Sequence, residues 1–179
     1  MLRAGTPDSA AWVLHTLQGA GVHAMGRRSF EDMASYWATS THPMAAAMND
    51  IPKVVFTREK SFDPAANSGL SKLEPTAAVT SWASARVAKG DLAEEIQRLK
   101  QEPGKNILAQ GGVEFARNLV RLGLVDEYRL VILPVVLGAG AALFSGLQHE
   151  LDLTLVSTSA FQGGVVAHVY RPAAAPVVE

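Results

Sequence analysis

The chain contains no cysteine, which excludes disulfides, thiolate metal sites and a cysteine nucleophile. Neither sign of charge is in excess: sixteen lysines and arginines stand against seventeen aspartates and glutamates, for a formal net charge of −1. No global field therefore draws the protein to nucleic acid or to an anionic membrane, and any anion site must be local. The lack of cysteine fits a reducing compartment, and we expect a cytoplasmic protein.

Long hydrophobic runs and paired metal ligands are missing as well. Every apolar run is too short or too interrupted to span a bilayer, so we expect no membrane segment. The five histidines are scattered without the spacing of paired ligands, so we expect no metal site. The 179 residues, 48% hydrophobic and 18% charged, predict one α/β domain over residues 1–179 with a large core.

Helical and strand patterns alternate along the first two thirds of the sequence. Thr6, Pro7 and Asp8 are typical of a helix start with a hydroxyl cap, and this helix should end near Gly19 or Gly21. Further helices are predicted over residues 29–37, 42–49, 91–100 and 113–122, and strands over residues 22–25, 53–57 and 106–110.

The patterns of the remaining segments are weaker. Residues 59–75 are rich in turn formers and predict a loop, and AAVT (77–80) and ARVAK (85–89) are strand candidates. Residues 126–137 predict a strand that is nearly all apolar from Leu130, which is typical of the centre of a sheet. Residues 151–159 and 164–171 alternate apolar and polar side chains and predict a C-terminal antiparallel hairpin.

A strand, a glycine and a helix follow one another at two places, MGRRS (25–29) and AQGGVE (109–114). Each junction exposes free backbone N–H groups at the positive end of a helix, where a phosphate group can bind. At Gly111 and Gly112 the missing side chains let the backbone approach phosphate oxygens, while Val113 and Glu114 begin the helix. A tight packing turn is the alternative interpretation of these glycines.

Three arginines stand near these junctions. Arg27 and Arg28 lie in the first junction, and Arg58 follows the predicted strand at residues 53–57. A guanidinium fork suits a phosphate monoester, whereas an ordinary surface charge is the alternative for each arginine. Two possible phosphate-binding positions with adjacent arginines are consistent with a site for a diphosphate-bearing cofactor.

The segments MGRRSFE, KVVFTR and ILAQGGVEFARNLVRLGLVDEYRLVILPVVLGAGAALF, in this order, resemble the dihydrofolate reductase superfamily. The resemblance is to its bacterial branch related to the C-terminal reductase domain of RibD, and it covers residues 12–170. It implies a three-layer α/β fold with a mixed, mostly parallel central sheet flanked by helices. It also implies an NADPH-dependent reductase and a homodimer.

The resemblance places the cofactor on particular residues. A turn of the type Gly-Arg-x-Thr/Ser that binds the adenosine-side phosphates matches Gly26, Arg27, Arg28 and Ser29. The pair around the adenine ribose and its 2′-phosphate matches Thr57 and Arg58, and this extra charge implies a preference for NADPH over NADH. The turn on the diphosphate matches the segment of Gln110, Gly111, Gly112, Val113 and Glu114.

The sequence departs from this family at its first element. Family members normally begin with a central strand that ends in a segment such as SLDG and lines the substrate pocket, whereas this chain first shows the helix around Trp12. We therefore expect the central strand to be absent, or its place to be filled by the tail AAAPVVE (173–179) or by a segment of a partner. Asp8 is the only carboxylate near the family's acidic substrate-binding position, and it serves equally well as a helix-start charge.

The expected activity is hydride transfer from NADPH to a small planar substrate. A pteridine, a dihydrofolate-like compound or a riboflavin-pathway pyrimidine is implied by the resemblance, and no catalytic residue is assigned. The main alternative is a non-catalytic nucleotide-binding or structural protein that keeps the residues that contact the phosphates of NADPH. An unrelated α/β domain with coincidental glycines is the third possibility, and it predicts no affinity for nucleotides.

Overall fold

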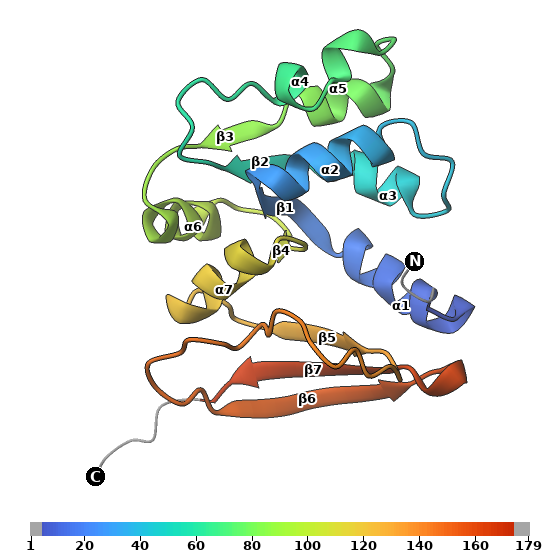
Figure 1. The fold of residues 1–179 in the computed structure, drawn as a ribbon, viewed down its shortest axis with the longest axis vertical. Coiled ribbons are helices and arrows are strands. Elements are labelled where there is room, and N and C mark those ends of the chain that lie inside the picture. Colours follow the sequence, from blue (N-terminus) through green and yellow to red (C-terminus); the bar gives the residue numbers. More distant parts are fainter. Residues whose placement is uncertain (1–4, 174–179) are drawn as a thin grey trace.

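The computed structural model describes residues 5–173 and contains two separate β-sheets (Figure 1). The first sheet is parallel and has the strand order β3-β2-β1-β4. Its members are β1 (Ala20–Gly26), β2 (Lys53–Phe56), β3 (Arg86–Ala88) and β4 (Asn106–Ala109). The three crossovers between successive strands all contain helices, as parallel pairing requires.

Helices cover both faces of the parallel sheet. They are α1 (Pro7–Gln18), α2 (Arg27–Trp37), α3 (Ala45–Asp50), α4 (Pro64–Asn67), α5 (Ala77–Ala83), α6 (Leu92–Gln101) and α7 (Val113–Arg121), with 3₁₀ turns η1 (Leu70–Lys72) and η2 (Gln162–Gly164). Side chains alternate along a strand, so Met25 and Val55 pack with α1, α2, α3 and α5, whereas Ala24 and Val54 pack with α6 and α7. The result is the three-layer arrangement that the family resemblance implies.

The C-terminal part of the chain forms the second sheet, which is antiparallel. Its strands are β5 (Tyr128–Ile132), β6 (Leu153–Ala160) and β7 (Val166–Pro172), in the order β5-β7-β6. The β6–β7 pair confirms the predicted hairpin. Figure 1 shows this sheet below the parallel one, with α7 and α1 between them.

The prediction of a central strand over residues 126–137 is wrong. The strand ends at Ile132, two residues before Pro134, and β5 lies at an edge of its sheet with Ile132 half exposed. Proline has no N–H for a sheet ladder, which explains the early end. The apolar pattern is that of a covered strand, but no described strand pairs with β5 on its outer edge.

The expected single sheet is thus divided into two. β4 pairs only with β1, and β5 pairs only with β7, so no described strand connects these two edges. The tail AAAPVVE (173–179) is a predicted replacement for the central strand, and its residues 174–179 lie outside the described part of the chain.

Two local predictions between β2 and β3 are also wrong. Residues 59–75 contain α4 and η1 rather than only a loop, and AAVT belongs to α5 rather than to a strand. The α-helices α4 and α5 both have capped starts. In α4, Asp63 Oδ1 accepts from the Ala66 amide at 2.7 Å, and in α5, Thr76 Oγ1 accepts from the Val79 amide at 3.2 Å. Such caps stabilise short helices and outweigh the weak strand pattern. ARVAK does contain the predicted strand, as β3.

Candidate functional site

Three of the segments singled out in the sequence follow the carboxyl ends of adjacent strands. β1 lies between β2 and β4, with Gly26 opposite Phe56 and Ala24 opposite Ala109. Residues 26–29, 57–58 and 110–114 therefore meet at one edge of the parallel sheet. In open α/β sheets, ligands bind outside this edge.

The Gly111–Gly112 turn packs directly against the first turns of α2. Both glycines have positive φ, 86° and 78°. A Cβ at position 111 would lie 2.6 Å from Met33 Cε, and one at position 112 would lie 2.8 Å from Ser29 Oγ. The positive φ values and these close contacts favour glycine at both positions whether or not a phosphate binds beside them. The packing interpretation is therefore supported, and the phosphate interpretation depends on the hydrogen-bond donors next to the turn.

Those donors include the starts of two helices. α2 begins at Arg27 and α7 begins at Val113, and neither Gly26 nor Gly112 can supply a side-chain acceptor for the first backbone N–H groups. The α2 start also lacks an acidic residue, and Glu114 at the start of α7 is paired with Arg117 at 2.7 Å. Free N–H groups at a helix start bind anions well.

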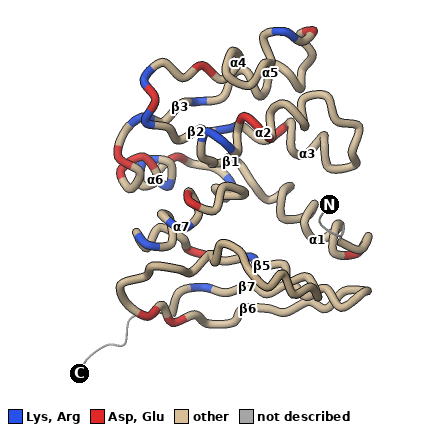
Figure 2. The backbone as a smooth tube through the Cα atoms, in the orientation of Figure 1, with Lys and Arg blue, Asp and Glu red and all other residues tan. Residues whose placement is uncertain are grey.

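The arginines divide into one paired and two free side chains. Arg27 Nη1 lies 2.9 Å from Glu31 Oε1, and Arg27 Nε lies 3.5 Å from Glu59 Oε2. Arg28 and Arg58 are exposed, and neither forms an ion pair with another residue of the described chain. Figure 2 marks the basic positions where α2 begins beside β2. Of the three arginines singled out in the sequence, Arg28 and Arg58 are thus the ones that carry unpaired charge.

Thr57 links the arginine loop to the sheet. Its backbone N–H donates to the Ala88 carbonyl at 3.1 Å, and its Oγ1 accepts from the Glu59 amide at 3.1 Å. These bonds hold the loop that carries Arg58 next to the paired Arg27. The hydroxyl is consequently engaged within the loop, and its predicted contact with a ribose stays a prediction.

Two buried polar residues behind the site gave no signal in the sequence. His23 of β1 is fully buried, and its Nε2 lies 3.4 Å from the Gln110 carbonyl oxygen. Lys53 of β2, opposite His23 in the register, donates from Nζ to the Asn49 carbonyl at 2.6 Å and to Ser81 Oγ at 2.8 Å. Burial lowers the pKa of Lys53 to about 8. Single polar residues in apolar strands look the same in sequence whether buried or exposed.

His23 should make the stability of the protein depend on pH. Burial, and then the positive charge of Lys53, lower its pKa from 6.5 to about 4, although the bond to Gln110 acts in the opposite direction. Between these pH values the unfolded chain binds more protons at His23 than the folded chain does. The contribution of the neutral histidine to the free energy of unfolding is therefore fully present above about pH 6.5 and is lost as the pH falls toward 4. We expect a loss of about 3 kcal/mol in the free energy of unfolding.

Urea unfolding of the wild type and of His23→Gln at several pH values between 4 and 7 measures this effect. Carboxylates titrate in both proteins, so the difference between the two curves isolates His23. Parallel curves for the two proteins would contradict the buried neutral histidine.

Asp8 holds α1 to the second sheet. Its Oδ2 accepts from the Gln162 amide at 2.9 Å and its Oδ1 from the Ser9 amide at 3.0 Å. Thr6 precedes the helix as predicted, but its hydroxyl donates to Ser9 Oγ at 3.2 Å and caps no backbone N–H, so the predicted hydroxyl cap is wrong. The contacts of Asp8 are those of a structural helix-start residue.

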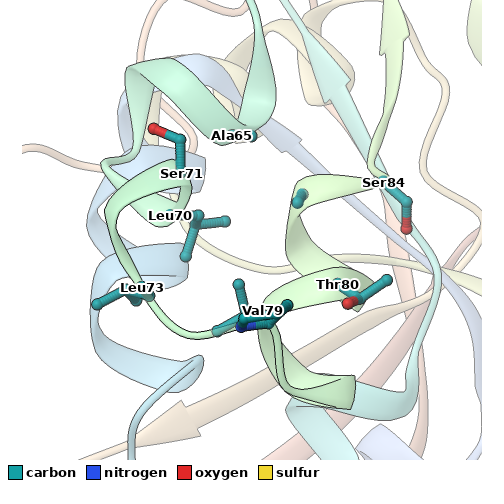
Figure 3. A pocket seen from close by; sticks show the side chains of 9 residues that line it. Ala65, Leu70, Ser71, Leu73, Val79, Thr80 and Ser84 are labelled. Carbon is teal, nitrogen blue, oxygen red and sulfur yellow. The ribbon is translucent and has the colours of Figure 1, made fainter.

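Two hollows of the surface lie away from this edge. The larger, of about 540 Å³, lies between α4, η1 and α5 and is lined by Leu70, Val79 and Thr80 among others, without a lysine or arginine (Figure 3). The smaller, of about 320 Å³, lies at the opposite, amino-terminal ends of β1, β2 and β3. Neither of these two hollows includes the uncapped helix starts.

The described residues contain no cluster of three or more histidines, aspartates or glutamates that could hold a metal ion. Within the same part of the chain, no helix is both long enough and apolar enough to cross a membrane.

Three parallel strands with uncapped helix starts and free arginines at their carboxyl edge define an α/β protein with a surface suited to a phosphate-bearing ligand. The sequence identifies the family: residues 6–167 match the model of the RibD C-terminal domain, and the chain belongs to that family. The family is reductase-like, in agreement with the resemblance noted from the motifs.

Two curated relatives of Bacillus subtilis (strain 168) match part of the chain. The uncharacterized protein YyaP is 45% identical over 81 residues, which are 45% of this chain and 43% of the relative. The uncharacterized protein YwjB is 40% identical over 74 residues, which are 41% of this chain and 42% of the relative. Each match thus spans less than half of either protein.

Solved structures with low sequence identity share the fold. A putative riboflavin biosynthesis protein from Shewanella sp. PV-4 aligns with a TM-score of 0.68 at 19% identity, covering 96% of this chain and 84% of that one. A pyrimidine reductase-like protein from Corynebacterium diphtheriae aligns with a TM-score of 0.63 at 17% identity, with 96% and 83% covered. RibD of Acinetobacter baumannii aligns with a TM-score of 0.66 at 16% identity, with 96% and 52% covered.

Proposed function

We propose that the protein is an NADPH-dependent reductase that transfers hydride to a small planar substrate. A riboflavin-pathway pyrimidine is the first candidate, followed by a pteridine and a dihydrofolate-like compound. The observation that carries the proposal is the meeting of both glycine junctions with the free Arg28 and Arg58 at one sheet edge. Membership of a reductase-like family supports the same activity.

The donor set at this edge has the chemistry that a phosphorylated dinucleotide requires. Arg28 and Arg58 would supply unpaired cations for the 2′-phosphate, and the first N–H groups of α2, which have no side-chain cap, would add donors. Gly111, Gly112 and the start of α7 would hold the diphosphate. NADPH, when bound, supplies the hydride, and the protein holds it in place beside the substrate.

The proposal takes the proton from water. Asp8 is the carboxylate that the resemblance places nearest to a substrate position, and both of its oxygens already accept backbone hydrogen bonds. Adjacent Asp126 and Glu127 are engaged in ion pairs, with Lys100 at 2.7 Å and with Arg129 at 2.7 Å respectively. None of these groups is free to act as an acid.

A non-catalytic nucleotide-binding protein is the second candidate, and the divided sheet favours it. The resemblance implies that a central strand lines the substrate pocket, whereas no described strand lies between β4 and β5. This candidate keeps the phosphate contacts at Arg28, Arg58 and the Gly111–Gly112 turn but has no turnover.

Absorbance at 340 nm separates the two candidates. The protein is mixed with NADPH and, in turn, a flavin-pathway aminopyrimidine, a pterin and dihydrofolate. The reductase proposal predicts substrate-dependent oxidation of NADPH by the wild type and its loss in Arg28→Ala/Arg58→Ala. NADPH binding without oxidation in the presence of any of these substrates would support the binding protein instead.

We also propose a homodimer. Apolar side chains are exposed along the segment after β5 and on β6: Val136 is 97% exposed, Leu137 73% and Leu155 53%. Burial of such surface is the main source of stability in permanent dimers. Sedimentation equilibrium should give twice the mass of the chain, and a monomer at micromolar concentration would refute this assembly.

A further inference from the structure

A buried imidazole lies behind the Gly111–Gly112 turn and bonds to it. His23 is fully buried in β1, one strand away from the turn, and its Nε2 is 3.4 Å from the carbonyl oxygen of Gln110. A carbonyl oxygen only accepts, so Nε2 carries the hydrogen and donates it. Gln110 immediately precedes Gly111, so this bond restrains the last carbonyl before the turn.

The rest of the imidazole has no polar partner. Nδ1 is buried and unpartnered, as is Oε1 of Gln110, among the described side chains. Leu108 lies opposite His23 on the β4 side, and Lys53 lies opposite on the β2 side with its ammonium committed to Asn49 and Ser81. The Gln110 carbonyl is thus the one polar contact that a side chain at position 23 makes in the described structure.

A displacement of the Gln110 carbonyl would affect both halves of the candidate site. The turn that follows lies in close contact with the side chains of Met33 and Ser29 of α2. Gly26, at the other junction, is packed against Phe115 of α7, with 3.5 Å between a Cβ placed there and Phe115 Cβ. The two helix starts are therefore held in register by contacts on either side of the turn.

We propose that His23 is a positioning residue of the nucleotide site, which holds the Gln110–Gly112 turn in place through the Gln110 carbonyl. His23 touches no ligand in this account and acts through the turn. The inference rests on the proposed function, in which this turn binds the diphosphate of NADPH. It identifies a buried residue, outside the motifs of the site, on which nucleotide affinity depends.

Two variants at position 23 separate the hydrogen bond from packing. In His23→Gln the amide nitrogen can occupy the place of Nε2 and donate to Gln110, whereas His23→Leu fills similar space without a donor. We expect His23→Leu to weaken NADPH binding about tenfold, the effect of one lost hydrogen bond, and His23→Gln to stay within about twofold of the wild type. Equal affinity of both variants and the wild type would overturn the proposal.

Lys53→Met is the matched control. Lys53 is the register neighbour of His23 and is equally inaccessible, but its contacts are to Asn49 and Ser81. We expect this variant to change the melting temperature but to keep NADPH affinity within about twofold, because Lys53 makes no hydrogen bond to the turn. If Lys53→Met weakens binding as much as His23→Leu, the effect is general destabilisation and the proposal is wrong.

Amide hydrogen exchange at Gly111 and Gly112 tests the positioning role without any nucleotide. His23→Leu should exchange these amides about tenfold faster than the wild type, and His23→Gln should not. If the wild type fails to bind NADPH while this exchange pattern is found, the proposed function is wrong and the positioning role stands. If exchange is unchanged in His23→Leu, the positioning role is wrong whatever the nucleotide affinity.

Discussion

Replacing Arg28 and Arg58 together with alanine is expected to weaken NADPH binding by about a hundredfold, with much less effect on NADH. Each charge-assisted hydrogen bond to a phosphate contributes about 1.5 to 3 kcal/mol, so two lost bonds account for at least this change. NADH lacks the 2′-phosphate that these arginines are proposed to contact. Calorimetric titration of both nucleotides at a fixed ionic strength measures the effect.

Two single variants serve as controls for this result. Arg27→Ala should have a smaller effect, because Arg27 is already paired with Glu31 and Glu59. Arg98→Ala, on α6, removes a surface cation paired with Glu95 and should have no effect on either nucleotide. Equal losses for NADPH and NADH in the double variant would refute the assignment of Arg28 and Arg58 to the 2′-phosphate.

Gly112→Ala is expected to abolish measurable nucleotide binding and to lower the free energy of unfolding by about 2 to 4 kcal/mol. A side chain at φ 78° is strained, and its Cβ would lie 2.8 Å from Ser29 Oγ at the start of α2. Either the Ser29 hydroxyl rotates away or the turn shifts from the helix start, and the strained backbone at position 112 then perturbs both proposed phosphate contacts. Urea unfolding and NADPH titration give the two quantities.

Gly69→Ala is the matched control for backbone strain. Gly69 has a similar φ of 73°, but a Cβ there meets no atom within 4 Å, and the residue lies between α4 and η1. It should cost about 1 kcal/mol and leave NADPH affinity unchanged. If the two alanine variants have the same stability and the same affinity, the close contact at Gly112 is unimportant.

The parallel half of the fold could be predicted because its signals are local. KVVF and NILA are short apolar runs bounded by turn residues. Asp91 precedes α6 as its N-cap, and its side chain accepts from the amides of Ala93 and Glu94, as its position before an amphipathic run indicates. Parallel pairing then places all three candidate segments at one edge. The residues of the candidate site, in contrast, were assigned from the resemblance of their motifs to a known family, and the structure brings these segments to one edge.

The position of β5 could not be predicted in the same way. Its apolar run is what a covered central strand requires, but the coverage depends on a neighbouring strand and not on β5 itself. Strand periodicity reports how a residue pattern alternates, and contains no information on whether a partner strand is present. The exposed Val131 and Ile132 are the physical consequence.

Which arginines of the site form ion pairs could be predicted only in part from the sequence. Glu31 lies four residues after Arg27, so its ion pair on α2 could be anticipated from helical spacing. Glu59 reaches Arg27 only because β2 lies beside β1, which is a tertiary contact. Arg28 and Arg58 therefore emerge as the free pair only from the structure.

Comparing the affinities of the wild-type protein for NADPH and NADH by calorimetry, at the same pH and ionic strength, tests the central claim most directly. The proposed site predicts that NADPH binds at least about tenfold more tightly, because free guanidinium groups meet the 2′-phosphate. Equal affinities, or no heat with either nucleotide, would contradict an NADPH site at the carboxyl edge of β1, β2 and β4.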